Sequence, residues 1–188
     1  VVGAGVRAAD EDMRQKLLAQ DLLTTVVEQE ADHSSARVTG SMIGYIKPGE
    51  TEEIISALAD PAIRIASLTI TEGGYFINSA SGKFDPQHPD IVADAANPAS
   101  PKTVFGLLLA GLARRRKTGI VPFTVMSCDN IPHNGVVTKN SLVGLAELFD
   151  GELAEWVRSK VAFPNGMVDR ITPATSDRVF AWLGSPKR

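Results

Sequence analysis

The sequence predicts an α/β fold, because three apolar runs resemble buried strands and each gives way to polar or small residues before a helical pattern. The runs are residues 1–6 (VVGAGV), residues 65–70 (IASLTI) and the run that begins at Phe123 (FTVM). β-Branched and aromatic residues favour strands. In an open α/β sheet ligands bind outside the carboxyl ends of the strands. The residues that follow these runs are therefore the candidates for a functional site.

The remaining elements are expected in alternation with these strands. Further strands are predicted at residues 23–28 and 36–46, and helices at residues 10–19, 51–59, 91–96, 102–116, 134 to 146–149 and 151–161. Met13, Leu17 and Leu18 are expected to face the core, Thr51 to cap its helix and Gly119 to end another. Residues 75–100, rich in proline and glycine, are expected to form a long surface excursion.

Length and charge narrow the function classes. The 188 residues are enough for one domain or a little more, with 44% apolar and 22% charged residues, as in ordinary soluble proteins. A net charge of −3 offers no broad attraction to nucleic acid or to an anionic membrane. The longest apolar run, residues 104–113, is too short to span a bilayer. The basic run at residues 114–117 is expected at the end of a helix, where cations complement the helix dipole.

Cysteine and histidine give little sign of a nucleophile or a metal. Cys128 is the single cysteine, so no internal disulfide can form, which fits a reducing, cytoplasmic compartment. It is read as a small buried residue beside the site, with a nucleophile as the alternative. His33 and His88 are expected in solvated loops, although the sequence around His88, DPQHPD, could also bind a metal. We predict no metal site.

The strongest candidate site follows the run at Phe123, where the sequence reads SCDNIPHNG over residues 127–135. The amide of Asn130 can donate to an oxygen and accept from a hydroxyl, which suits an alcohol being converted to a carbonyl. Alternatively, Asp129 and Asn130 only cap the helix that follows.

Several longer motifs carry a resemblance to a known family. They are SCDN at residues 127–130, FPNGMVDRITP at 163–173, GVRAAD at 5–10, SLTITEGGY at 67–75 and PKTVFG at 101–106. Taken in chain order, they resemble the motifs of the long-chain polyol dehydrogenases, the family of mannitol dehydrogenase and fructuronate/tagaturonate reductase. The resemblance implies a Rossmann-type doubly wound sheet over residues 1–175, with residues 176–188 as a tail or the start of a connection to a second domain. It also implies that the sheet is incomplete, because the family's glycine turn, in its first βα unit, is expected upstream of Val1. Gly3-x-Gly5 lacks the third glycine of G-x-G-x-x-G.

The resemblance also implies roles for individual residues. Asn130 would hydrogen-bond the reacting oxygen, Glu72 would relay the proton from the general base to solvent, and Asp169 would hold substrate hydroxyls. Open alternatives are a surface turn for Glu72 and a salt bridge to Arg170 for Asp169.

Three further residues would bind the cofactor: Asp10, Arg7 and Thr71. A carboxylate at Asp10 would accept hydrogen bonds from the ribose 2′-OH and repel a 2′-phosphate, which favours NAD, whereas Arg7 could pair with that phosphate. Asp10 could also be only the first residue of its helix.

The activity implied is NAD-dependent hydride transfer between a secondary alcohol of a polyol or aldonate and the corresponding ketose or keto-uronate. The family's general base is a lysine in a downstream catalytic domain, and nothing matching it follows Thr175. We therefore expect these residues alone to bind cofactor poorly and not to turn over. Two alternatives remain: a catalytically inactive Rossmann-like module, and an NADP-dependent short-chain enzyme. The second would need a lysine four residues after a tyrosine, and neither Tyr45 nor Tyr75 has one.

Overall fold

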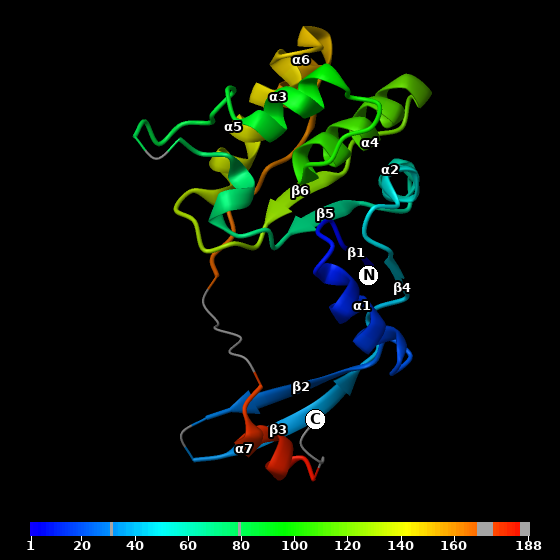
Figure 1. The fold of residues 1–188 in the computed structure, drawn as a ribbon, viewed down its shortest axis with the longest axis vertical. Coiled ribbons are helices and arrows are strands. Elements are labelled where there is room, and N and C mark those ends of the chain that lie inside the picture. Colours follow the sequence, from blue (N-terminus) through cyan, green and yellow to red (C-terminus); the bar gives the residue numbers. More distant parts are fainter. Residues whose placement is uncertain (31, 79, 169–174, 185–188) are drawn as a thin grey trace.

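The fold is seen in a computed structural model, which describes residues 1–30, 32–78, 80–168 and 175–184. Its strands form three pairs (Figure 1). β1 (Val2–Ala4) pairs in parallel with β4 (Gly44–Ile46), and β5 (Ile65–Leu68) pairs in parallel with β6 (Thr124–Ser127). β2 (Thr24–Gln29) and β3 (Ser34–Thr39) form an antiparallel hairpin. Parallel pairs linked through helices are the arrangement of a Rossmann-type α/β domain, as the sequence predicted.

The larger core lies between β5–β6 and a layer of four helices. In Figure 1 these helices lie together above the two strands: α3 (Pro89–Ala96), α4 (Val104–Thr118), α5 (Asn134–Glu147) and α6 (Gly151–Lys160). Phe123 and Val125 from the β6 run are buried against Leu142 and Leu145 of α5. α4 is buried over most of its length. Gly119 ends it with a left-handed φ of 72°, as predicted.

A smaller core joins the other parallel pair to the helical layer. It consists of Ile46 of β4, Ile54 and Ile55 of α2 (Thr51–Ala59), and Leu107 of α4. The bounds of α2 are those predicted, but Thr51 is its first residue and not its cap. Glu50 stands at the cap position and makes no side-chain cap bond.

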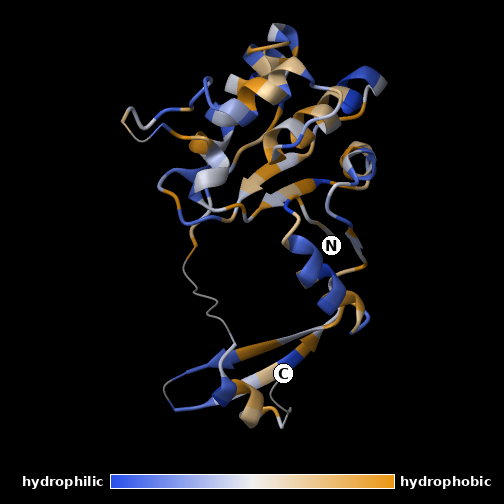
Figure 2. Ribbon diagram, viewed as in Figure 1, coloured by the Kyte–Doolittle hydropathy of each residue, from blue (hydrophilic) through white to orange (hydrophobic). Residues whose placement is uncertain are grey.

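β1 and the helix that follows it are less buried than their sequence suggested. Val2 is 37% exposed, so β1 is not the buried strand expected. α1 (Asp10–Leu18) contains no buried residue, and Met13 and Leu18 are exposed, so its predicted core face is wrong. Figure 2 shows α1 as hydrophilic along its length, in contrast to the apolar residues of β5 and β6.

The expected strand at residues 36–46 is two strands separated by residues 40–43. β3 pairs with β2, whereas β4 pairs with β1, so the chain changes partner within one apolar run. Alternation of residue types predicts extended backbone but not its partner, which is why the break was missed.

The hairpin of β2 and β3 lies at the lower end of the molecule in Figure 1, where the short helix α7 (Asp177–Trp182) is also found.

The predicted surface excursion after residue 75 contains more structure than expected. It follows a 3-10 turn, η1 (Glu72–Tyr75), and includes a bridge between Ile77 and Phe84, neither of which was expected. The helix predicted at residues 91–96 is confirmed as α3. Tyr75 is fully buried, and its ring meets that of Phe105 edge to face at 5.8 Å.

Candidate active site at the carboxyl ends of β5 and β6

The parallel register of β5 and β6 brings two distant polar segments together. Leu68 pairs with Ser127 at the end of both strands, and the N–H of Cys128 donates to the carbonyl of Leu68 at 2.8 Å. The TEGGY residues at 71–75 and the SCDN residues at 127–130 therefore leave the same edge of the sheet. This is the position at which α/β folds bind ligands.

The carboxylate of Asp129 joins these two segments. Oδ2 accepts the N–H of Ile70 at 3.0 Å and the hydroxyl of Tyr75 at 2.7 Å, and Oδ1 accepts the N–H of Thr71 at 3.0 Å. Asp129 therefore does not cap α5. The cap position is His133, with a left-handed φ of 53° and no side-chain cap bond, so the alternative of capping by Asp129 or Asn130 is wrong.

Tyr75 is the buried partner in this network and was not singled out from the sequence. Its hydroxyl lies 2.6 Å from Ser127 Oγ. Burial, together with the neighbouring Asp129 carboxylate, raises the pKa of Tyr75 well above its usual value, while the contact with Ser127 acts in the opposite sense. The hydroxyl therefore stays protonated and donates to Asp129. The only sequence signal was its place at the end of TEGGY.

Glu72 and Asn130 extend from the two joined segments into solvent. Both are exposed, and neither side chain hydrogen-bonds to another residue within the described part of the chain. Thr71, directly before Glu72, has a φ of 62° and a ψ of 168°, a conformation that is unusual for a β-branched residue. The structure thus brings Glu72 and Asn130 to one edge of the sheet with their polar groups free.

The FPNG segment lies against the start of α5. Asn134 Nδ2 donates to the carbonyl of Gly166 at 2.9 Å, and the N–H of Gly166 donates back to Asn134 Oδ1 at 2.9 Å. The N–H of Gly135 donates to Asn165 Oδ1 at 2.9 Å. The two motifs recognised in the sequence are therefore in direct contact. Asp169, the predicted substrate ligand, lies outside the described residues.

Asp10 holds the turn between β1 and α1. Its Oδ2 accepts the N–H groups of Val6 and Arg7, each at 2.9 Å, while Oδ1 lies 3.5 Å from Arg7 Nη2. Although burial alone would raise it, the pKa of Asp10 is lowered by these N–H groups and by the Arg7 guanidinium. The Asp10 side chain is 25% exposed and that of Arg7 79% exposed, so both are accessible to a ligand.

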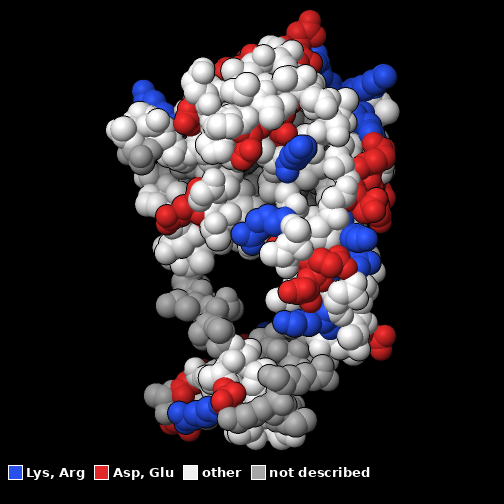
Figure 3. All heavy atoms as spheres, viewed as in Figure 1, with Lys and Arg blue, Asp and Glu red and all other residues white. Residues whose placement is uncertain are grey.

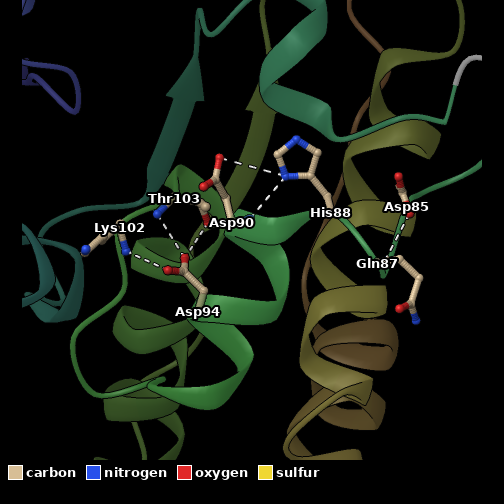
Figure 4. A network of polar contacts seen from close by, with 7 residues as sticks. All are labelled: Asp85, Gln87, His88, Asp90, Asp94, Lys102 and Thr103. Atoms are coloured by element: carbon tan, nitrogen blue, oxygen red, sulfur yellow. Dashed lines mark hydrogen bonds and ion pairs between the residues drawn. The ribbon is translucent and has the colours of Figure 1, made fainter.

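The His88 region is structural. The histidine is the cap residue of α3, where its Nδ1 accepts the N–H of Asp90 at 3.3 Å (Figure 4). Its ring also meets that of Phe76, with 4.8 Å between the ring centres. The prediction that His88 is a freely solvated loop residue is therefore wrong. Nearby, Asp94 accepts the N–H groups of Lys102 and Thr103 and the Thr103 hydroxyl.

Within the described residues, one group of side chains lies close enough together to share a cation. It consists of Glu30, Asp32 and His33, all exposed in the β2–β3 hairpin. Cys128 is a free, half-buried thiol.

The three arginines of the basic run at the end of α4 make contacts within the chain. Arg114 pairs with Glu52 and Arg116 with Glu152, while Arg115 is buried. Basic and acidic side chains are interspersed on the face drawn in Figure 3. In the part of the chain that the structure describes, no helix has both the length and the apolar character needed to cross a membrane.

Comparison with known proteins agrees with this arrangement. The mannitol dehydrogenase Rossmann domain family matches residues 1–182. A mannitol 2-dehydrogenase of Cereibacter sphaeroides is 60% identical over 177 residues, which are 93% of this chain and 37% of that protein. A polyol:NADP oxidoreductase of Gluconobacter oxydans is 44% identical over 95% of this chain and 38% of its own length.

The fold has a solved counterpart. The Pseudomonas fluorescens mannitol 2-dehydrogenase in ternary complex with NAD and D-mannitol superposes with a TM-score of 0.90 at 48% identity, covering 97% of this chain and 37% of that one. The chain thus spans between a third and two fifths of the length of the relatives it matches. By sequence and by fold, the chain belongs to the mannitol dehydrogenase family, whose Rossmann domain it matches.

Proposed function

We propose that the chain is the cofactor-binding part of an enzyme that transfers hydride between NAD and a secondary alcohol of a polyol or aldonate. The observation that supports this most directly is the common position of Glu72 and Asn130 at the carboxyl ends of β5 and β6, where neither side chain bonds to another of the described residues. The relatives named as mannitol 2-dehydrogenases favour a mannitol-like polyol as the substrate.

The arrangement suits the oxidation of an alcohol. Loss of hydride from a carbinol requires removal of the hydroxyl proton and stabilisation of the developing alkoxide. The Asn130 amide would donate to that oxygen, and Glu72 would pass the proton to solvent. Asp169 would hold neighbouring hydroxyls. The general base is proposed to come from the family's second domain, so that the 188 residues alone turn over poorly or not at all.

NAD, which would accept the hydride, fits the residues at the start of α1. Because Asp10 Oδ2 is occupied by two backbone N–H groups, ribose hydroxyls would bind at Oδ1, which they would share with Arg7 Nη2 3.5 Å away. A carboxylate there disfavours a 2′-phosphate. Arg7 and Thr71 would complete the contacts to the cofactor. Because the Gluconobacter relative is named for NADP, the experiment compares the two cofactors.

A chimera gives the decisive experiment. This chain would replace the matching 177 residues of the Cereibacter sphaeroides enzyme, to which it is 60% identical. Formation of reduced nicotinamide would be followed with mannitol, sorbitol and aldonates, with NAD and with NADP. We expect turnover with NAD and a polyol. A folded chimera that binds NAD without turnover would instead support an inactive binding module, and a preference for NADP would contradict the role given to Asp10.

A further inference from the structure

Asp129 stands out as a half-buried carboxylate that bonds to the turn carrying Glu72. All three of its donors belong to residues 70–75, which lie 54 to 59 positions earlier in the sequence. A carboxylate accepts such bonds more strongly than a neutral oxygen does. Asp129 is also the residue directly before Asn130, so its position ties two site residues from distant segments.

The backbone of Thr71 explains why such a contact is needed. Its φ of 62° lies in the region that β-branched residues avoid. The N–H of Thr71 donates to Asp129 Oδ1 at 3.0 Å in this conformation. Because Glu72 is the next residue, the conformation at Thr71 sets the direction in which the Glu72 side chain leaves the sheet.

The backbone of Asp129 is also fixed by hydrogen bonds. The N–H of Asp129 donates to Ser127 Oγ at 3.3 Å, and its carbonyl accepts from Asn134 Nδ2 at 3.3 Å. Ser127 Oγ in turn contacts the hydroxyl of Tyr75, which is fully buried. Hydrogen bonds thus hold the backbone of Asp129 through both its N–H and its carbonyl. Rotation of the side chain away from Thr71 would break its bonds to Ile70, Thr71 and Tyr75 together.

From this geometry we propose that Asp129 is a positioning residue: it holds Thr71 in its positive-φ conformation and so fixes the placement of Glu72 relative to Asn130. It does not touch the reacting atoms. The link to catalysis rests on the proposed function, whereas the link between Asp129, Thr71 and Glu72 can be tested without turnover.

A second carboxylate in the chain provides a matched control. Asp94 also accepts two backbone N–H groups and one hydroxyl, from Lys102 and Thr103, at 2.6 to 2.9 Å, but it lies in the helical layer (Figure 4). Asp94→Asn and Asp129→Asn therefore each disturb two bonds from backbone N–H groups and one from a hydroxyl, at different places in the fold. A general loss of stability would appear in both variants, and a change at the site only in the second.

The experiment uses backbone-amide NMR and hydrogen exchange on the 188-residue chain. In Asp129→Asn we expect exchange at Ile70 and Thr71 to accelerate about tenfold or more relative to the remaining core amides, with shifted signals for Glu72 and Asn130. Asp94→Asn should leave these signals in place. Adding Thr71→Gly to Asp129→Asn should restore the Glu72 signal, because glycine adopts a positive φ without strain.

Other results would overturn the proposal. Unchanged Glu72 and Asn130 signals in Asp129→Asn, an equal effect of Asp94→Asn, or no restoration by Thr71→Gly would each do so. If Asp129→Asn does not fold, Tyr75→Phe removes one of the three donors and should give smaller shifts at the same amides. In the chimera, Asp129→Asn should lower kcat more than it raises KM, and Thr71→Gly should recover part of the loss. An inactive chimera would count against the proposed function and leave the NMR result standing.

Discussion

Asn134 and Gly166 exchange two hydrogen bonds, one in each direction and both at 2.9 Å. The Asn134 amide therefore behaves like a stretch of backbone that pairs with the FPNG segment. Asn134 is 1% exposed, and its Nδ2 also reaches the carbonyl of Asp129. One buried side chain thus holds both motifs of the candidate site together.

Asn134→Ala should lower the free energy of unfolding by about 2 kcal/mol, because the N–H and carbonyl of Gly166 would lose their partner. Urea titration of the chain measures this. Asn140, exposed on the same helix, is the control, and Asn140→Ala should change stability by no more than about 0.5 kcal/mol. Equal losses in the two variants would mean that the Asn134 contacts contribute little.

Arg115→Met should be more damaging still. Arg115 is 1% exposed and donates to the carbonyls of Leu58, Asp60, Ile63 and Val121, while its guanidinium lies 5.0 Å from the centre of the Phe123 ring. Burial lowers the pKa of Arg115. Removing the donors would leave these four carbonyls without the guanidinium and leave a cavity at a fully buried side chain, and we expect a loss of about 3 kcal/mol or more in denaturant titration.

Arg116→Ala is the control for Arg115. Its ion pair with Glu152 is exposed, and such pairs contribute about 0 to 1 kcal/mol. A loss in Arg115→Met no larger than in Arg116→Ala would contradict the role given to the buried guanidinium.

Gly135→Ala should displace the FPNG segment. A Cβ at this position would lie 2.5 Å from the carbonyl oxygen of Phe163 and 2.6 Å from that of Pro164, and backbone atoms cannot move aside as a side chain can. We expect a loss of about 1 to 3 kcal/mol in thermal and denaturant unfolding. Gly151→Ala, where no atom lies within 4 Å, should be neutral to within about 0.5 kcal/mol. Similar behaviour of both variants would show that the segment is not held at this distance.

Stability in acid should depend on Glu52. Hydrogen bonds from Arg114, and then from Ser56, lower the pKa of its carboxyl from 4.5 to about 2 in the folded chain. The pKa of Glu52 in the folded chain thus lies below its value in the unfolded chain. The stabilisation is therefore complete above pH 4.5 and is lost as the pH falls toward about 2. Glu52→Gln should therefore lose less stability than the parent chain across this interval in urea titrations at several pH values. Glu53→Gln, on the same turn, should behave like the parent.

Asn130→Ala in the chimera should lower kcat by about 10²- to 10³-fold, the usual effect of removing a donor to a developing oxyanion. KM for the polyol should change much less, because the bond strengthens mainly in the transition state. Steady-state kinetics test this, with Asn140→Ala expected to match the parent chimera. A change confined to KM would make Asn130 a substrate-binding residue only.

The sequence predictions that were correct differ in their physical basis from those that were wrong. Features set by local chemistry were predicted correctly, such as the bounds of α2 and the end of α4 at Gly119, where only a left-handed residue fits. The motifs also indicated the family, because long runs such as SCDN and FPNGMVDRITP are specific in themselves. The cofactor and substrate roles of Asp10, Glu72, Asn130 and Asp169 remain predictions.

The errors concern partners that lie far apart in the chain. The apolar pattern of residues 36–46 says that the backbone is extended, but not that its two halves pair with different strands. Met13 and Leu18 mark an apolar face of α1, yet no other element among the described residues buries it. Hydrophobic periodicity identifies a face that could be buried, and only the packing of other elements decides whether it is.

The sequence by itself determined that strands of an α/β fold end in polar residues at TEGGY and SCDN, since residue type and spacing carry that information. Only the tertiary structure decided what those residues do for each other. Asp129, which locally could have capped α5, instead bonds to Ile70, Thr71 and Tyr75. The parallel pairing of β5 and β6 brings those donors within 3.0 Å, and a contact made by strand register has no signature in either segment alone.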